Sequence, residues 1–442
     1  MAFRIPKQLW AFPAQLHRTS SYGAASRSSR TSVCPLLLSQ RACLEANWQG
    51  GRQSASIATG GTQQDLPLNG ITVVSLEQAI AAPFCTRQLA DLGARVIKVE
   101  RPGAGDFARA YDTRVNGLSS HFVWTNRSKE SLALDLKQEK DLGVLRRLIG
   151  RADVLVQNLA PGAADRLGVS YAKLKDEHPS LIFCDISGYG DTGPYRDKKA
   201  YDLLVQSEAG LLSITGTETE PAKVGISIAD IASGMYAYSG ILAALIKRGK
   251  TGRGSRVDVS MLEAMAEWMG FPMYYAYEGQ PAPSPTGASH AAVYPYGPFE
   301  TGGDGGSVML GVQNEREWAR LCAEVLERPE LAADARFATN PLRSRNRGAL
   351  RRIIRDAFAA LPAAEVRRRL DGAQIANAQV RDVQGLWDHA QLRARGRWTE
   401  VETPNGRVPA LLPPGVAEAR MGRVPDVGEH NAEILAELGL EP

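Results

Sequence analysis

The sequence predicts an α/β protein, with a large domain built on a mostly parallel β-sheet and a smaller α+β domain after it. From residue 70 onward, short β-branched runs alternate with helical segments. Near residue 280 the composition changes to a connector rich in Pro, Ser and Gly, and helical, strongly basic sequence follows it. Strands that alternate with helices are typical of βαβ units, in which helices join parallel strands. A chain of 442 residues can form more than one core.

Five short apolar runs read as strands of the large domain. They are ITVVSL (71–76), ARVIKVE (94–100), SLALDL (131–136), ADVLVQNL (152–159) and SLIFCDIS (180–187). The clearest helix between them is EKDLGVLRRLIG (139–150), because its leucines and Ile149 fall on one face. Right-handed crossovers would place loops and ligands at the carboxyl ends of the strands.

The stretch ISIADIASGMYAYSGIL (226–242) begins like an apolar strand and continues as a helix after Asp230. A stripe of Met235, Tyr238, Leu242 and Leu245 predicts an amphipathic helix. We expect it to close at Lys247-Arg248-Gly249, since basic residues followed by Gly often end a helix. The turn TGRG then leads into a strand, SRVDVSM, and a helix, LEAMAEW.

Beyond the connector GQPAPSPTGASH, the stretch YPYGPFETGGDGGSVMLGV predicts two strands joined by a Gly-rich hairpin loop. Helical sequence fills most of residues 312–385, and GRWTEVETPNGRVPALLPPG predicts a hairpin that turns at Asn-Gly. These changes predict four segments. They are a basic leader over 1–62, the large domain over 68–280, the small domain over 285–385 and a C-terminal segment over 390–442.

Composition and charge exclude several classes of protein. A net charge of +4 is too mild to indicate nucleic acid. The sequence has no apolar run of the roughly 20 residues that a membrane span needs, so we expect no membrane partner. Five scattered cysteines without a CxxC pair, and six histidines without HExxH, predict neither a metal site nor a disulfide framework.

The first 62 residues are rich in Ser, hold seven Lys or Arg and have one acid, Glu45. That composition is typical of a mitochondrial presequence, and a disordered basic tail is the alternative. The presequence reading predicts a location in the mitochondrial matrix, a reduced compartment that suits unpaired cysteines.

The turn after the first strand, SLEQAIAAPF, contains neither GxGxxG nor GxxxxGK[ST], which disfavours dinucleotides and P-loop ATP binding. Basic residues instead stand just past strand ends, at Arg101, Lys137 and Arg166, and Asn158 follows another strand. Each alone reads as a solvated surface residue. Together they predict an anionic, nucleotide-like ligand at one edge of the sheet.

Asp230 admits two interpretations. Asp is a preferred N-cap, so it could merely start the helix. No Lys or Arg lies within four residues of it, and Ile, Ala and Gly surround it. A carboxylate at a helix N-terminus is favoured in its ionised form, and small neighbours leave room for an acyl group. Those features suit a carboxylate nucleophile. The residues alone leave both interpretations open.

The order of motifs resembles the class III (CaiB/BaiF-type) CoA-transferases from about residue 68 to the end. The matching stretches are AAPFCTRQLADLGARVIKVERPGAGD, NRSKESLALDLK, ADVLVQNLAPGAADRLG, SGYGDTGPY, AYD, ISIADIASGMYAYSGILAALIKRGKTGRGSRVDVSM and VGEHNAEILAELG. Within the family, TGASHAAVYPYGPFE and FATNPLRSRNR are similar to the branch of mitochondrial succinate–hydroxymethylglutarate CoA-transferases.

The resemblance implies a Rossmann-like large domain built from both chain ends, a small domain between them and an interlocked homodimer. It implies a CoA-transferase that moves CoA from succinyl-CoA, or a similar acyl-CoA, to a short-chain mono- or dicarboxylic acid. Asp230 falls on the family's nucleophile, which forms an aspartyl anhydride and then an aspartyl-CoA thioester. Coenzyme A is then a substrate, and no tightly bound cofactor is expected. The segments that would contact it include Arg101, Leu134, Lys137, Asn158, Arg166, Lys199 and Tyr201.

Two departures from the family's patterns narrow the range of reactions that we expect of this chain. The family's racemases have a His-Asp pair where this chain has Tyr201-Asp202, which weighs against the first alternative, a 2-methylacyl-CoA racemase. A non-catalytic CoA-binding protein is the second alternative. The formyl/oxalate branch has a run of glycines over the nucleophile and often Gln at the position of Ile80, so formyl-CoA and oxalate are not expected. Ile80, His290 and Tyr296 are the substrate-loop candidates, and the identity of the acceptor acid stays open.

Overall fold

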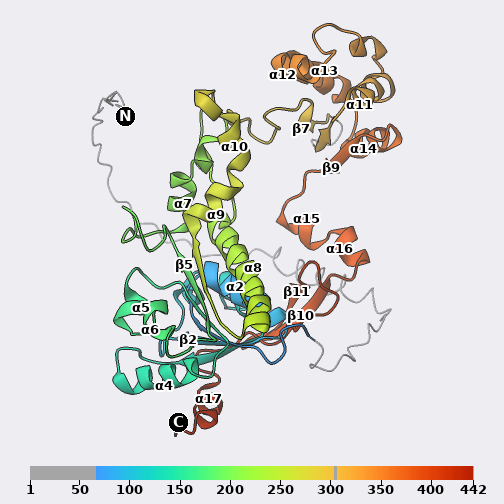
Figure 1. Cartoon of the computed structure of the whole chain (residues 1–442). Coiled ribbons are helices and arrows are strands. Elements are labelled where there is room, and N and C mark those ends of the chain that lie inside the picture. Colours follow the sequence, from blue (N-terminus) through green and yellow to red (C-terminus); the bar gives the residue numbers. More distant parts are fainter. Residues whose placement is uncertain (1–65, 303–305, 442) are drawn as a thin grey trace, which may run out of the picture. The chain divides into compact units, whose positions relative to one another are not determined.

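The computed structural model describes residues 66–302 and 306–441, drawn in colour in Figure 1. The predicted presequence, residues 1–62, therefore lies outside the described residues.

A six-stranded sheet forms the large domain. Its strands are β1 (Thr72–Leu76), β2 (Arg95–Glu100), β3 (Lys129–Ala133), β4 (Val154–Gln157), β5 (Ile182–Ser187) and β6 (Arg256–Ser260). They lie in the order β3-β2-β1-β4-β5-β6, and every neighbouring pair is parallel. This is the strand order of a doubly wound sheet, in which ligands bind at the carboxyl edge where the order reverses. The predicted parallel α/β fold is confirmed.

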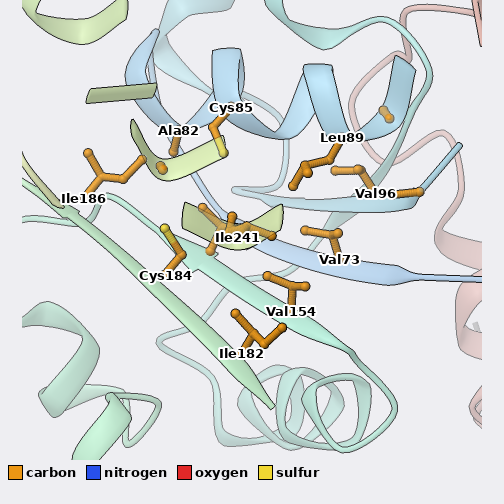
Figure 2. Packing of buried hydrophobic residues seen from close by; sticks show 14 of the residues in the cluster. Val73, Ala82, Cys85, Leu89, Val96, Val154, Ile182, Cys184, Ile186 and Ile241 are labelled. Atoms are coloured by element: carbon orange, nitrogen blue, oxygen red, sulfur yellow. The ribbon is translucent and has the colours of Figure 1, made fainter. Parts of the chain in front are cut away.

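Helices cover both faces of this sheet because successive residues of each strand point to opposite sides. Val73 of β1 packs with α2 (Ala81–Asp91) and α8 (Ile228–Thr251), whereas its neighbour Val74 packs with α4 (Glu139–Ile149) and α17 (Asn431–Glu437). Figure 2 shows the first of these cores, where Cys85 and Leu89 of α2 and Ile241 of α8 meet the sheet. Burial on both faces explains why the strands read as nearly continuous apolar runs.

Helix α8 differs from its prediction at both ends. Ile228 already belongs to the helix, so the stretch directly before Asp230 is not a strand. The helix continues to Thr251 and ends at Gly252, whose φ of +69° is left-handed, rather than at Gly249. The helix is long and apolar enough to cross a bilayer by length and composition alone. Its packing against α2, β5 and β6 accounts for that composition in a core helix.

The close approach of α8 to α2 depends on a glycine. A Cβ on Gly234 would lie 2.7 Å from the carbonyl oxygen of Ala81, the first residue of α2. The buried face of α8 is otherwise made largely of alanines, while Met235 of the predicted stripe is 37% exposed. Small residues thus bring the first turn of α2 beside the first turns of α8.

A three-stranded antiparallel sheet lies later in the chain. Its strands are β7 (Tyr296–Glu300), β8 (Ser307–Gly311) and β9 (Ala376–Gln379), in the order β7-β8-β9. The predicted pairing of β7 with β8 is confirmed. Strand β9 was not predicted, because ANAQ is short and polar. The hydrophobic core on this three-stranded sheet includes Trp318 of α11 (Glu315–Arg320), Phe358 of α13 (Arg347–Phe358) and Leu370 of α14 (Ala363–Gly372). The domain boundaries drawn from the sequence stay predictions.

The chain then forms the predicted hairpin of β10 (Trp398–Thr403) and β11 (Gly406–Leu411). It turns at Pro404-Asn405, one residue earlier than expected, because Gly406 already pairs with Thr403. Further on, the His430 N–H donates to the Ser131 carbonyl at 3.1 Å, so this segment is bonded along β3, the edge strand of the large sheet. The remaining α-helices are α3 (Ser120–Asn126), α5 (Ala163–Arg166), α6 (Tyr171–Leu174), α7 (Asp202–Glu208), α9 (Met261–Trp268), α10 (Gly270–Tyr275), α12 (Asn340–Arg345), α15 (Val383–Trp387) and α16 (Ala390–Ala394).

Candidate active site

The start of α8, which carries Asp230, is capped by a carboxylate from another helix. Asp202, the first residue of α7, accepts the N–H of Ala229 at 2.7 Å and that of Asp230 at 3.3 Å through Oδ1. Ser227, at the N-cap position itself, makes no capping bond. The interpretation of Asp230 as the helix cap is therefore wrong. Within residues 66–302 and 306–441, no group forms a hydrogen bond with the Asp230 carboxyl oxygens.

The surroundings of Asp230 oppose its ionisation. Burial, and then the charge of Asp202, raise its pKa to about 7. From the sequence we expected the helix dipole to keep the Asp230 carboxyl group ionised. Burial and a like charge outweigh the effect of the dipole. Near neutral pH the carboxyl group is therefore partly protonated. A perturbed carboxyl at the edge of a sheet where ligands bind is a candidate for chemistry.

One tyrosine, Tyr111, lies within electrostatic range of this carboxyl, and Tyr201 lies within range of Tyr111. The pKa of Tyr111 is raised by burial and by Asp106, Asp230 and Tyr201. Tyr201, predicted to contact CoA, is 68% exposed. The ring of Tyr111 meets that of His121 edge-on, with centroids 5.3 Å apart. Tyr111 and His121 were not predicted from the sequence, because they lie in a segment without a motif. No pattern in that segment indicates that Tyr111 lies near Asp230.

The turn after β1, which contains Ile80, is held by side chains from neighbouring strand ends. Asn158 accepts the Gln78 N–H and donates to the Gln78 carbonyl, each at 2.9 Å. Ala79 has a φ of +61° and donates its N–H to Asp106 at 3.1 Å. The amide of Asn158, predicted to contact CoA, thus holds this turn, and Ile80 is buried at the N-cap position of α2.

A fully buried ion network lies behind this turn. The Lys98 ammonium is 2.8 Å from Asp106 and 3.3 Å from Glu77, and the Lys129 ammonium is 2.7 Å from Glu77. Burial works to raise the pKa of Glu77, but Lys129 and Lys98 outweigh it and lower that pKa to about 2. The four residues come from different elements, so their pairing could not be read from the sequence.

Four of the predicted CoA-contacting residues are exposed cations: Arg101, Lys137, Arg166 and Lys199. Arg101 follows β2, Lys137 follows β3 and Arg166 ends α5 after β4, which places these three at the carboxyl edge of the sheet. Within the described part of the chain none of the four forms an ion pair, whereas Lys198 pairs with Glu208. Leu134 is buried, with 4% of its surface exposed, and its N–H donates to the Glu100 carbonyl.

The substrate-loop candidates His290 and Tyr296 lie together. Their rings stack with centroids 5.4 Å apart and an interplanar angle of 7°. Nδ1 of His290 accepts the N–H groups of Ala292 and Val293, both at 3.0 Å, which leaves Nε2 as the ring N–H donor of the neutral form. The contacts of the described residues do not bring this pair to Asp230. No cluster of three potential metal ligands occurs in the described ranges.

These features define an α/β protein with exposed cations along the carboxyl edge of its sheet and a half-buried carboxyl group of raised pKa at Asp230. The chain belongs to CoA-transferase family III, which it matches over residues 68–431. It is 32% identical over 414 residues to the human (Homo sapiens) succinyl-CoA:glutarate CoA-transferase, covering 90% of this chain and 92% of that protein. It is 33% identical over 386 residues to the succinate–glutarate CoA-transferase of Agrobacterium fabrum, covering 84% and 96%.

A solved structure supports the same family assignment. The crystal structure of a CaiB/BaiF family protein from Brucella suis matches 84% of this chain and 99% of its own, with a TM-score of 0.74 and 33% identity. The family resemblance drawn from the motifs is therefore confirmed. The protein is an enzyme of the CoA-transferase type, which acts on CoA thioesters and carboxylic acids.

Proposed function

We propose that this enzyme moves CoA from succinyl-CoA to a short-chain dicarboxylic acid and that Asp230 is its nucleophile. The observation that carries the proposal is the Asp230 carboxyl group, which lies at the start of α8 but takes no part in capping it. A nucleophilic carboxylate must be free of strong hydrogen bonds and open to an acyl group. The names of both relatives, which pair a succinyl donor with glutarate, support the donor and a dicarboxylate acceptor.

The reaction proceeds in four steps that require no oxidant, metal or ATP. The Asp230 carboxylate attacks the thioester carbonyl of succinyl-CoA, the C–S bond breaks, and CoA leaves as a thiolate. The thiolate then attacks the Asp230 carbonyl of the mixed anhydride, which releases succinate and leaves an aspartyl-CoA thioester. The acceptor carboxylate attacks this thioester and displaces the thiolate. Finally the thiolate attacks the acceptor side of the second anhydride, which regenerates the Asp230 carboxylate.

CoA binding at the carboxyl edge of the sheet is supported by the unpaired cations. Arg101 and Lys137 follow adjacent parallel strands, β2 and β3, and neither has a carboxylate partner in the described structure. Phosphate groups of CoA would provide the missing counter-charge through charge-assisted hydrogen bonds. We assign Arg166, Lys199 and the exposed ring of Tyr201 to the same ligand. His290, Tyr296 and Ile80 stay proposed as residues of the substrate loop and turn.

The proposal includes a homodimer. Large apolar side chains are exposed one after another from the end of α9 to residue 277. They are Trp268 (46%), Phe271 (58%), Met273 (58%), Tyr274 (79%), Tyr275 (48%) and Tyr277 (64%). Soluble monomers rarely expose such a patch, and a second copy of this chain is the occupant that the family resemblance implies. Light scattering should give twice the mass of the chain, and Tyr274→Glu should lower it to that of one chain. A wild-type monomer at micromolar concentration would contradict this assignment.

A mitochondrial matrix location rests on the Ser- and Arg-rich leader, which has one acidic residue in 62. Fusion of residues 1–62 to a fluorescent protein should send that protein into mitochondria. Replacing the seven basic residues with Gln should leave it in the cytosol, and cytosolic fluorescence of the unaltered fusion would contradict the location.

Isotope exchange tests the function directly. With unlabelled succinyl-CoA and carbon-labelled succinate, the enzyme should move label into the thioester, and Asp230→Asn should abolish this exchange while the protein stays folded. Binding of CoA without exchange would instead indicate a non-catalytic binder. Loss of deuterium from the α-carbon of a 2-methylacyl-CoA, in the absence of any free acid, would indicate a racemase.

A further inference from the structure

We propose that Asp202 is a positioning residue that fixes the start of α8 and places a negative charge beside the Asp230 carboxyl group, which sets the pH range in which Asp230 can act as the nucleophile. This inference rests on the proposed function, because it concerns the same carboxyl group.

The first part of the proposal rests on hydrogen bonds. Oδ1 of Asp202 accepts two N–H groups at the start of α8, from Ala229 and Asp230. Oδ2 accepts from the Gln206 amide at 2.6 Å, and the carbonyl oxygen of that amide accepts the Val224 N–H at 3.1 Å. Asp202 and Gln206 therefore join α7 both to the helix that carries Asp230 and to the segment that leads into it. A carboxylate cap of this kind holds the backbone of the nucleophile in one place.

The second part rests on which charges face Asp230. From the start of α7 it is Asp202, and the titratable group from the segment after residues 107–110 is Tyr111. The residues of α2 and α9 that pack against the first turns of α8 include Ala81, Phe84 and Met265, none of which is charged. Asp202 is thus the one charged group that perturbs Asp230 in the described structure, and no cation offsets it.

The consequence concerns when Asp230 can act as a nucleophile. The Asp202 carboxylate is held by hydrogen bonds beside the backbone of Asp230, so its negative charge opposes a second negative charge there. Burial and this charge together raise the pKa of Asp230 to about 7. Asp230 therefore becomes an ionised nucleophile as pH rises through the neutral range, and the charge of Asp202 helps to set where that range lies.

Asp202→Asn removes the charge and keeps the Oδ1 acceptor, so it separates the two parts. The acid limb of the kcat/KM profile, which reports ionisation of Asp230, should move down by about one pH unit. At high pH kcat should stay within about two-fold of the wild type, because Asn keeps the oxygen that accepts the N–H groups at the start of α8. Asp334→Asn removes a partly buried charge that pairs with Arg336, far from α7 and α8 in the sequence, and should leave the profile unchanged.

A charge exchange provides the matched control. In Asp202→Asn with Gln206→Glu, the new amide donates to the new carboxylate, which still accepts the Val224 N–H, and the negative charge returns near its original place. The acid limb should move back toward that of the wild type. The proposal is wrong if folded Asp202→Asn shows no movement of its acid limb. It is also wrong if the double variant with Gln206→Glu keeps the acid limb of Asp202→Asn. Failure of the proposed function is distinguishable, since then Asp230→Asn itself would still exchange label.

Discussion

At the scale of single residues, the proposed chemistry depends on when Asp230 ionises. Its carboxyl group is half-buried beside Asp202, and these two causes raise its pKa to about 7. A nucleophile must be ionised, so kcat/KM should rise with pH through about 7 and level off above it. A profile that is flat from pH 5.5 to 8 would contradict the pKa assigned to this group.

The same pKa makes a prediction for stability. The folded state holds the Asp230 proton more tightly than the unfolded chain, whose pKa is about 3.9. The stabilisation is therefore complete below the unfolded pKa and is lost as pH rises through about 7. Asp230→Asn cannot ionise, so at pH 8 it should be more stable than the wild type by about 2 to 4 kcal/mol. Urea unfolding at pH 5 and pH 8 measures this, and an equal difference at both pH values would contradict it.

At the scale of elements, the nucleophile's position depends on the contact between α2 and α8. Gly234→Ala would place a Cβ 2.7 Å from the Ala81 carbonyl oxygen, so the two helices must separate. Such overpacking should lower the free energy of unfolding by about 1 to 3 kcal/mol and reduce kcat.

Gly249→Ala is the matched control in the same helix. Nothing lies within 4 Å of its added Cβ, and Ala is the better helix former, so this change should stabilise the protein by up to about 1 kcal/mol. Chemical denaturation compares the two variants, and equal effects would mean that the helix contact is not tight.

The buried ion network supports the β1–α2 turn at the same scale. Lys98→Met leaves Glu77 and Asp106 facing each other with Lys129 as the one remaining cation in contact with Glu77. Removing one member of a buried ion set typically costs about 3 to 5 kcal/mol. The variant's unfolding midpoint in urea should fall accordingly, whereas removal of the exposed Lys175 should have little effect. A small loss for Lys98→Met would show that the network tolerates an unpaired carboxylate.

At the scale of the whole molecule, the carboxyl edge of the sheet gathers the cations. Arg101→Ala and Lys137→Ala should each raise KM for succinyl-CoA by about five-fold with little change in kcat, because they contact a part of the substrate that does not react. Lys173→Ala, a cation change in the short helix α6, is the control. Steady-state kinetics at low and high salt should show the effect weaken with salt. A fall in kcat instead of a rise in KM would place these residues at the reacting atoms.

Much of this architecture could be predicted because it is local. Apolar runs predicted the strands, Asn405-Gly406 predicted the hairpin, and the chain order of motifs predicted the family. Strand β9 escaped prediction because its four residues are polar. The cap of α8 could not be predicted, because Asp202 lies 28 residues before Asp230, whose N–H group it accepts. The ion network escaped prediction for the same reason, since its members meet only after the sheet has formed.

The central claim is that Asp230 forms an anhydride with the substrate acid, and oxygen transfer tests it most directly. When succinate labelled with heavy oxygen attacks the aspartyl-CoA thioester, the bridging oxygen comes from succinate and stays on Asp230 after succinyl-CoA is released. Mass spectrometry of the peptide that contains Asp230, after turnover with succinyl-CoA and labelled succinate, should therefore show heavy oxygen on this residue. Full exchange of succinate into succinyl-CoA with no heavy oxygen on Asp230 would contradict the account.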